Sequence, residues 1–359
     1  MIKFLYPTNL IVNGVLIIAN IFYVSDYIYL ISPSPLTYNM NDIKIMIDGI
    51  IVAYQKILNN NYKKTHESVQ IIRINFNGKI NEPIKITILY MDEEYHMTLN
   101  ENFFVKNEKI DKICAHTLFK SDYDLLINYI THHKSLGIKN YILYYNDKLN
   151  KLQNDAKSIL EYLNNDDQIN VTFIEWDYKY WTGIDETWKS YTDINICHCA
   201  QITAINDMLY KSKYMFDYVL FSDLDEYLYL EKDINDLLNN NVDVDCFIIY
   251  MYWSKYISEH NIDELISITD FTDYFNINNF NKYKTDIPDV REHINRSKII
   301  VKTSNNFINN IHKPYFDISI NNKDITLKLN TIYIDGIYQI ANLKDKYRKT
   351  IIDTYNYYV

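Results

Sequence analysis

The sequence predicts an α/β domain on a largely parallel sheet, preceded by a β-rich N-terminal domain. From residue 111 onward, apolar runs alternate with stretches of helical periodicity, the pattern of strands joined by crossover helices. Before residue 110, apolar and polar residues alternate between turn signals, as in antiparallel strands. We therefore expect a sandwich-like accessory domain at 1–110, the α/β domain at 111–330, and a closing strand and helix at 331–359.

One N-terminal segment is apolar enough to suggest a type II membrane anchor. Residues 10–31 are nearly long enough to span a bilayer. However, Asn20 and Asp26 interrupt the run, and Asn13-Gly14 is a strong signal for a two-residue hairpin. We therefore predict buried strands here rather than a membrane helix. Alternating runs predict further strands at 69–76, 84–90 and 95–99.

The α/β part begins with an apolar strand at 113–119. Apolar residues from Leu125 to Ile130 then recur at helical spacing, and Gly137 stands where a left-handed helix cap is expected. The alternation continues with strands at 138–145, 171–176, 219–221, 246–252 and 298–301 and helices at 147–163, 199–210 and 344–357. Residues 254–289 are polar, aromatic and irregular, which suits either acceptor binding or a surface loop.

The strongest functional signal is the segment from Tyr218 to Tyr227, in which an apolar run ends in Asp223, Asp225 and Glu226. Residues i and i+2 of an extended segment project to the same side, so Asp223 and Asp225 are expected to converge. Converging carboxylates repel unless a cation lies between them. Mg²⁺ and Mn²⁺ prefer such oxygen ligands and often keep coordination sites for phosphate. The pattern predicts a metal and phosphate site, while Asp-x-Asp alone fits a helix cap or solvated acids equally well.

Composition excludes some classes of protein. The net charge of −10 argues against nucleic-acid binding, which needs surplus Lys and Arg. Four cysteines are too few for a disulfide framework in 359 residues, and Cys197-His198-Cys199 lacks a second pair at zinc spacing. We expect a soluble, cytoplasmic protein. Abundant Asn, Ile, Lys and Tyr suggest an AT-rich genome such as that of a giant DNA virus, which would place the protein in host cytoplasm or virion.

Three groups of residues follow the order of known sequence blocks. They are Leu126, Tyr129, His133, Leu136-Gly137 and Tyr144-Tyr145-Asn146-Asp147; then Gln201, Ala204, Asn206-Asp207 and Asp223-Leu224-Asp225-Glu226-Tyr227; then Ser297-Lys298-Ile299-Ile300-Val301 and His312. Together these blocks resemble glycosyltransferase family 92, over roughly residues 113–314. Asn128-Tyr129 replaces the usual Glu-Trp and Trp253-Ser254 the usual Phe-Gly, so the chain resembles a distant member whose acceptor specificity does not carry over.

The resemblance implies a GT-A (Rossmann-like) fold, a UDP-sugar donor, a divalent metal (Mn²⁺, or Mg²⁺) and inversion at the anomeric carbon. It implies that Asp225 binds the metal, that Asp223 reaches the ribose or the metal, and that His312 completes the coordination sphere. The nucleoside is expected across the first two strand ends, at Thr117, Leu118, Asn146 and Asp147.

Other residues have two interpretations each. Gln201 is either a donor contact or a buried structural amide, and His133 is expected to be a packing residue. Lys298 and Lys313 are either diphosphate partners or ordinary solvated lysines. A general base is also required, and four acids in the presumed acceptor segment qualify: Glu259, Asp263, Glu264 and Asp289. Spacing does not choose among these acids, and we take Glu259 as a working candidate.

The resulting hypothesis is a metal-dependent inverting glycosyltransferase. It would move a hexose, galactose or glucose, from a UDP-sugar to a hydroxyl of a glycan or glycoprotein. The sequence leaves open whether the protein forms a homodimer. An Asp-x-Asp phosphohydrolase is one alternative, but such enzymes usually carry Thr or Val where this chain has Tyr227. A non-catalytic protein that binds nucleotides or glycans is the other.

Overall fold

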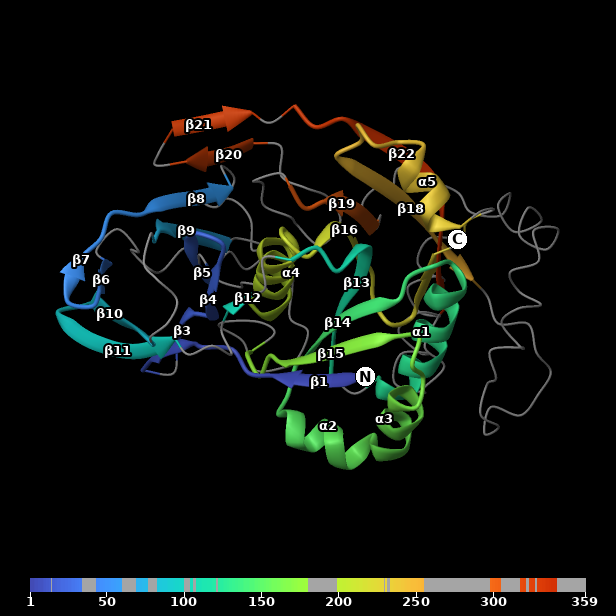
Figure 1. Ribbon diagram of the computed structural model, residues 1–359, viewed down its shortest axis with the longest axis horizontal. Helices are drawn as coiled ribbons and strands as arrows, with labels where there is room; N and C mark the ends of the chain where they lie inside the picture. The colour runs from blue at the N-terminus through green and yellow to red at the C-terminus, as the bar shows by residue number, and fades with distance from the viewer. Residues whose placement is uncertain are drawn as a thin grey trace, which may run out of the picture.

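The computed structural model consists of a β-rich half and an α/β half (Figure 1). It describes residues 1–13, 15–33, 43–59, 69–76, 83–99, 104–105, 108–120, 122–179, 199–228, 230, 233–254, 298–304, 317–320, 323–326 and 328–340. Within these residues the strands form sheets of nine, seven, four and two strands.

The α/β half is built on the nine-stranded sheet. Its strands, in spatial order, are β1 (Ile2–Leu5), β15 (Asn170–Glu175), β14 (Asn140–Tyr145), β13 (Asp111–Phe119), β16 (Phe216–Phe221), β19 (Lys298–Lys302), β18 (Cys246–Ser254), β22 (Thr331–Ile340) and β17 (Glu226–Leu228). The five strands β1, β15, β14, β13 and β16 run parallel to one another, whereas β19 is antiparallel to both β16 and β18. This mixed sheet confirms the predicted α/β class and is consistent with a GT-A-like fold.

The order of strands reverses at β13. Along the chain, β14 and β15 are added on one side of β13, and β16 pairs with its other side. In sheets of this type, ligands bind outside the carboxyl ends of the strands where the order reverses. The carboxyl ends of β13 and β16 therefore mark where a site is expected.

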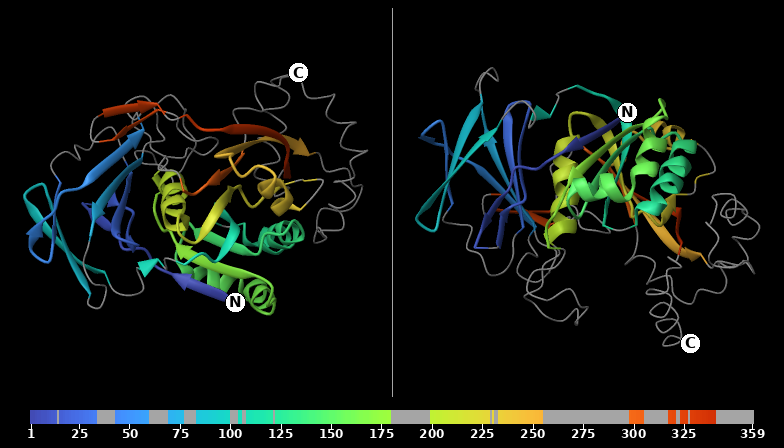
Figure 2. Two further views of the ribbon diagram at one scale, coloured as in Figure 1. Left: turned by 45° about the horizontal axis from the view of Figure 1, so that its top comes forward. Right: turned by 90° about the horizontal axis from the view of Figure 1, so that it is seen from below.

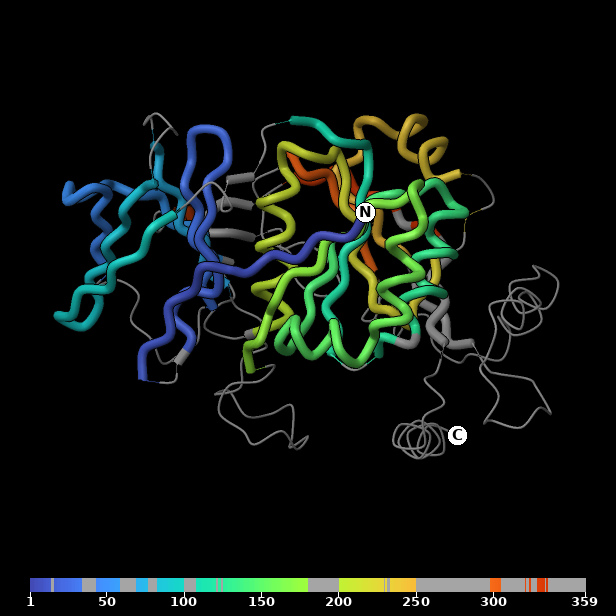
Figure 3. The backbone as a smooth tube through the Cα atoms, turned by 60° about the horizontal axis from the view of Figure 1, so that its bottom comes forward, coloured from blue at the N-terminus to red at the C-terminus, as the bar shows by residue number. Residues whose placement is uncertain are grey.

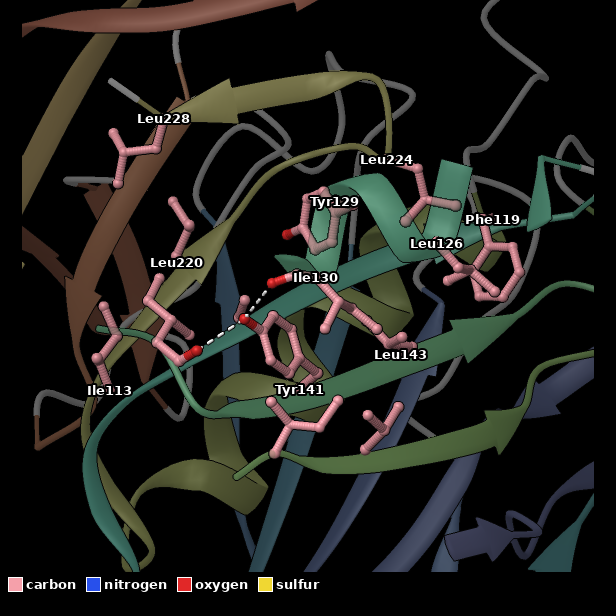
Figure 4. Close-up of a cluster of buried hydrophobic side chains, with 14 of the residues drawn as sticks. Ile113, Phe119, Leu126, Tyr129, Ile130, Tyr141, Leu143, Leu220, Leu224 and Leu228 are labelled. Carbon is pink, nitrogen blue, oxygen red and sulfur yellow. Dashed lines mark hydrogen bonds between the residues drawn. The ribbon is translucent and has the colours of Figure 1, made fainter. Parts of the chain in front are cut away.

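Helices cover both faces of this sheet. They are the 3-10 turn η3 (Tyr123–Leu125), α1 (Leu126–Ser135), α2 (Leu149–Asp155), α3 (Lys157–Asn164), α4 (Cys199–Ser212) and α5 (Ile234–Asn239). On one face, Leu126 and Ile130 of α1 pack with Leu143 and Leu220 of the sheet (Figure 4). The predicted helix at 147–163 is divided into α2 and α3 at Ala156, whose backbone leaves helical geometry with φ −112° and ψ 25°.

The other face of the sheet is covered by α4, which also contacts the β-rich half. Met208 of α4 belongs to one buried cluster with Val219 of β16 and with Phe22 and Tyr29 of the N-terminal strands. The two halves therefore share a hydrophobic core through this helix, which lies between them in Figure 2.

The β-rich half contains the three smaller sheets. They comprise β12 (Phe104–Val105), β4 (Asn20–Val24), β5 (Tyr27–Pro33), β9 (Val69–Asn75), β8 (Gln55–Asn59), β20 (Asp317–Ile320) and β21 (Lys323–Thr326); β11 (Glu93–Leu99), β10 (Ile84–Tyr90), β6 (Lys44–Ile47) and β7 (Ile50–Ile51); and the hairpin β2 (Leu10–Val12) and β3 (Val15–Ile18). Side chains from the seven- and four-stranded sheets pack against each other.

The apolar segment 10–31 forms buried strands, as predicted. Val12 pairs with Val15 in the antiparallel hairpin, and Asn13 has φ +50°. β5 is buried along nearly its whole length because one face packs on α4 and the other on the four-stranded sheet. A strand buried on both faces has a continuous apolar sequence, which explains the membrane-like composition. In the described residues, no helix has the length and apolar character needed to cross a membrane.

Two strands pair with the half of the molecule opposite to the one that the predicted domain boundaries gave them. β1, from the expected accessory domain, pairs with β15 at the edge of the nine-stranded sheet, and Figure 3 shows the chain crossing between the halves after it. β20, from the expected α/β domain, pairs with β8 of the β-rich half. The predicted closing strand is β22, between β18 and β17, and the predicted helix at 344–357 lies outside the described residues.

Candidate functional site

The acidic residues lie directly after β16, at the edge where the strand order reverses. One carboxylate oxygen each from Asp223, Asp225 and Glu226 lies within 4.8 Å of the other two. Asp223 and Asp225 are partly exposed, whereas Glu226 is 1% exposed. The three acids therefore converge, and Asp223 and Asp225 are the two that solvent can reach.

The acids converge for a different reason from the one that the sequence suggested. Residues 223–226 form a turn rather than an extended segment, with the Glu226 N–H donating to the Asp223 carbonyl at 3.1 Å. The Glu226 side chain folds back, and its Oε2 accepts the backbone N–H of Asp223 at 2.7 Å. We call residues 223–226 the acidic turn. Glu226 fixes the shape of the acidic turn through this hydrogen bond.

Lys298, the first residue of β19, brings a positive charge to the acidic turn. Its Nζ lies 2.7 Å from Asp223 Oδ2 and 3.1 Å from Glu226 Oε2, and its side chain is 4% exposed. Burial lowers the pKa of Lys298, but the two carboxylates outweigh burial and raise it above its usual value. Burial raises the pKa of the Glu226 carboxyl, and the Lys298 ammonium lowers it. The sequence left Lys298 as either a diphosphate partner or an ordinary solvated lysine, and in the structure its ammonium is buried in contact with two carboxylates.

Helix α1 holds the acidic turn at both ends. Before the turn, the Tyr129 hydroxyl hydrogen-bonds with Ser222 Oγ at 2.8 Å. After it, the Leu228 N–H donates to His133 Nε2 at 3.4 Å, and His132 Nε2 hydrogen-bonds with the Leu228 carbonyl at 2.7 Å. His133 is fully buried and has the structural role expected for it.

The residues expected around the nucleoside lie on the same edge, at the ends of β13 and β14. Thr117 is buried, and its Oγ1 has no hydrogen-bond partner within the described part of the chain. Leu118 is partly buried against the core shared with α4. Asn146 donates from Nδ2 to the carbonyls of Trp176 and Tyr178, at 2.7 and 2.8 Å. The Asn146 amide therefore has a structural role here.

Two further candidates flank this edge. Asp147 accepts from Lys151 Nζ at 2.8 Å, and this contact is the main reason that its pKa is lowered. Gln201 is partly buried in the first turn of α4.

One polar residue of this region was missed in the sequence. His116 of β13 lies beside the rings of Tyr144 and Phe221, with ring centroids 4.9 and 5.0 Å away. Burial lowers its pKa to about 3, although the Ile142 backbone and Asp223 both raise it, and its Nδ1 has no hydrogen-bond partner among the described residues. The only signal in the sequence is a histidine inside an apolar strand, which is weak because such residues often serve packing.

The remaining site predictions fall on residues that the structure does not describe. These are Glu259, Asp263, Glu264, Asp289, His312 and Lys313. The general base and the third metal ligand therefore stay predictions from the sequence.

Comparison with sequence models of known families shows to which protein family the chain belongs. The sequence model of glycosyltransferase family 92 matches residues 112–350, which begin within β13 and include the acidic turn and Lys298. The chain belongs to glycosyltransferase family 92. Membership of family 92 makes it a glycosyltransferase and confirms the resemblance found in the sequence.

Two other comparisons add little to the family 92 assignment. A search of curated proteins finds no match. Among solved structures, the chain is similar to 4-diphosphocytidyl-2C-methyl-D-erythritol synthase from Anaerococcus prevotii, at 10% identity and a TM-score of 0.30, over 70% of this chain and 99% of that one. A similarity this weak supports no functional conclusion.

Proposed function

We propose that this family 92 member is a metal-dependent, inverting glycosyltransferase. It transfers a hexose, galactose or glucose, from a UDP-sugar to a hydroxyl of a glycan or glycoprotein. The observation that carries the proposal is the convergence of Asp223 and Asp225 after β16, at the edge where the strand order reverses. Family membership favours glycosyl transfer over the phosphohydrolase hypothesis.

The ligand set fits a hard divalent cation. Asp223 and Asp225 offer carboxylate oxygens from a turn whose conformation is fixed by hydrogen bonds. Asp225 and Asp223 would hold Mn²⁺ or Mg²⁺, with His312 as the proposed third ligand. The metal, when bound, supplies charge neutralisation to the diphosphate leaving group.

The remaining residues of the edge provide contacts to the donor. The Thr117 hydroxyl is buried at the end of β13 without a partner among the described residues, so it is a candidate to hydrogen-bond the nucleoside. Leu118 and Asp147 lie on the same edge, and Gln201 lies in the first turn of α4. We propose that Asn146 supports the site by holding the chain after β15.

Transfer with inversion also needs a base for the acceptor. An acceptor hydroxyl attacks the anomeric carbon while a carboxylate takes its proton, and the nucleoside diphosphate leaves from the opposite face. We propose that this carboxylate comes from residues 255–289, with Glu259 as the first candidate and Asp263, Glu264 and Asp289 as the others.

The first prediction tests Asp225. Asp225→Asn keeps the size of the side chain but removes its charge, so we expect a loss of about 100-fold or more in Mn²⁺-dependent hydrolysis of the UDP-sugar and in transfer. The measurement is release of UDP, preceded by a panel of nucleotide sugars screened for thermal stabilisation with and without Mn²⁺.

The matched control is Asp217→Asn at the opposite end of β16, where the carboxylate is paired with Lys109 near the surface. This control should retain activity. Full activity of the folded Asp225→Asn variant would disprove the metal site. If the wild-type protein bound no UDP in the presence of Mn²⁺, the non-catalytic alternative would replace the proposal.

A further inference from the structure

Lys298 is in an unusual position for a lysine near a diphosphate site. Its side chain is 4% exposed, and its ammonium contacts the Asp223 and Glu226 carboxylates of the acidic turn. A flexible phosphate-binding lysine needs donors free to reach its ligand. Here two carboxylates engage the ammonium, and β19 fixes the backbone between β16 and β18.

The contacts of Lys298 divide the acidic turn into two parts. Glu226 Oε2 is shared between Lys298 Nζ and the Asp223 backbone N–H, and Glu226 is 1% exposed. Asp223 Oδ2 is bonded to Lys298, while Asp223 as a whole stays partly exposed. Lys298 and Glu226 thus form a buried pair in contact with Asp223, whereas Asp225 is partly exposed.

We propose that Lys298 is a positioning residue that orients the Asp223 carboxylate for the donor's metal and does not itself contact the diphosphate. This inference rests on the proposed function. Residues that fix the orientation of a metal ligand usually affect metal affinity by 10- to 100-fold. Removing the ammonium frees the Asp223 carboxylate to rotate and leaves Glu226 buried without its counter-ion.

The test compares Lys298→Met with Lys298→Arg. We measure the binding of Mn²⁺ alone and of Mn²⁺ with UDP, using the EPR signal of free Mn²⁺, and the KM for Mn²⁺ separately from kcat. We expect Lys298→Met to weaken Mn²⁺ binding by about tenfold or more, and Lys298→Arg to restore part of it because the charge is kept. The control is Lys302→Met on the same strand, whose ammonium donates to the Val242 carbonyl at 2.8 Å near the surface, and it should bind Mn²⁺ normally.

A second variant keeps the test decisive if Lys298→Met does not fold. Lys298→Gln removes the ammonium charge but keeps a hydrogen-bond donor, and it leaves Glu226 and its hydrogen bond to the Asp223 N–H in place. If Lys298 acts by positioning, the folded Lys298→Gln variant still binds Mn²⁺ about tenfold more weakly than the wild type. A lysine that only adds positive charge near the metal would repel it, and its removal would then tighten Mn²⁺ binding. Unchanged or tighter Mn²⁺ binding in either folded variant would therefore overturn the inference.

The inference and the proposed function fail in different ways. A wild-type protein that binds no Mn²⁺ with UDP overturns both. A wild-type complex in which Lys298 Nζ hydrogen-bonds the UDP diphosphate supports the function and overturns the positioning role.

Discussion

His133 uses both ring nitrogens to join α1 to the segment after the acidic turn. Nδ1 hydrogen-bonds with the Tyr129 carbonyl at 2.8 Å, and Nε2 accepts the Leu228 N–H at 3.4 Å. Only a neutral imidazole offers one donor and one acceptor. Burial accordingly lowers the pKa of His133 to about 3, with a further lowering by His132.

A neutral buried histidine makes the fold sensitive to acid. The pKa of His133 is about 3 in the folded protein against 6.5 ordinarily, so below pH 6.5 the unfolded chain binds more protons. Its contribution to stability is therefore complete above pH 6.5 and is lost as the pH falls toward 3. From pH 7 to pH 5 we expect the free energy of unfolding to fall by about 2 kcal/mol because of this group.

Urea unfolding at several pH values checks this expectation. His133→Gln should be less stable at pH 7 and should lose about that part of the pH dependence, whereas His96→Gln on the exposed strand β11 should keep it. An identical pH dependence in His133→Gln and the wild type would contradict the assignment.

The junction between α1 and α5 depends on Gly137. This glycine has φ +95°, and it ends α1 with its N–H donating to the Lys134 carbonyl, as the sequence predicted for a left-handed cap. A Cβ at this position would lie 2.6 Å from Asp233 Oδ2. The Asp233 side chain already has a hydrogen bond that would resist its displacement, because its Oδ1 accepts the Asn235 N–H at the start of α5.

Gly137→Ala should therefore destabilise the protein through backbone strain and through displacement of Asp233. We expect a loss of about 1–3 kcal/mol from strain alone, measured by thermal unfolding. Gly49→Ala is the matched control, since Gly49 has φ +80° but open space around its Cβ position. If the two variants lose equal stability, the contact with Asp233 contributes nothing.

The two halves of the molecule are joined by a buried polar network as well as by apolar packing. Asp207 of α4 is fully buried and accepts from Asn20 of the β-rich half at 2.8 Å and from Tyr144 of the nine-stranded sheet at 2.5 Å. Lys211 Nζ lies 2.7 Å from the same carboxylate. A network of this kind links the stability of one half to that of the other.

Asp207→Asn should lower the stability of both halves together. The substitution removes the charge opposite Lys211 and leaves buried groups imperfectly paired, so we expect a loss of about 3 kcal/mol or more. Calorimetry should show one transition, shifted downward. Asp166→Asn, which affects the more exposed pair with Lys134, should cost less than about 1 kcal/mol. Two separate transitions, with only one shifted, would show that the halves unfold independently.

Patterns among neighbouring residues of the sequence predicted many of the strands and helices. The apolar run before the acids became β16, and the helical spacing from Leu126 to Ile130 became part of α1, because each depends on neighbouring residues. The predicted fold class and the family resemblance are confirmed for the same reason, since they rest on the order of such segments.

What the sequence did not predict depends on partners far apart in the chain. Lys298 meets Asp223 across 75 residues, and nothing near either one indicates the pair. The pairing of β1 with β15 joins segments far apart in the sequence. The sequence likewise does not show that Glu226 is buried, because its burial depends on the folded structure around it.

The pairing of β20 with β8 has a consequence for synthesis on the ribosome. β8 is translated early, but the strand that pairs with its outer edge begins at Asp317. Until that segment emerges, a nascent chain carries an open strand edge, and open edges recruit other strands. Polypeptides released before residue 317 should therefore be more prone to self-association than the complete chain.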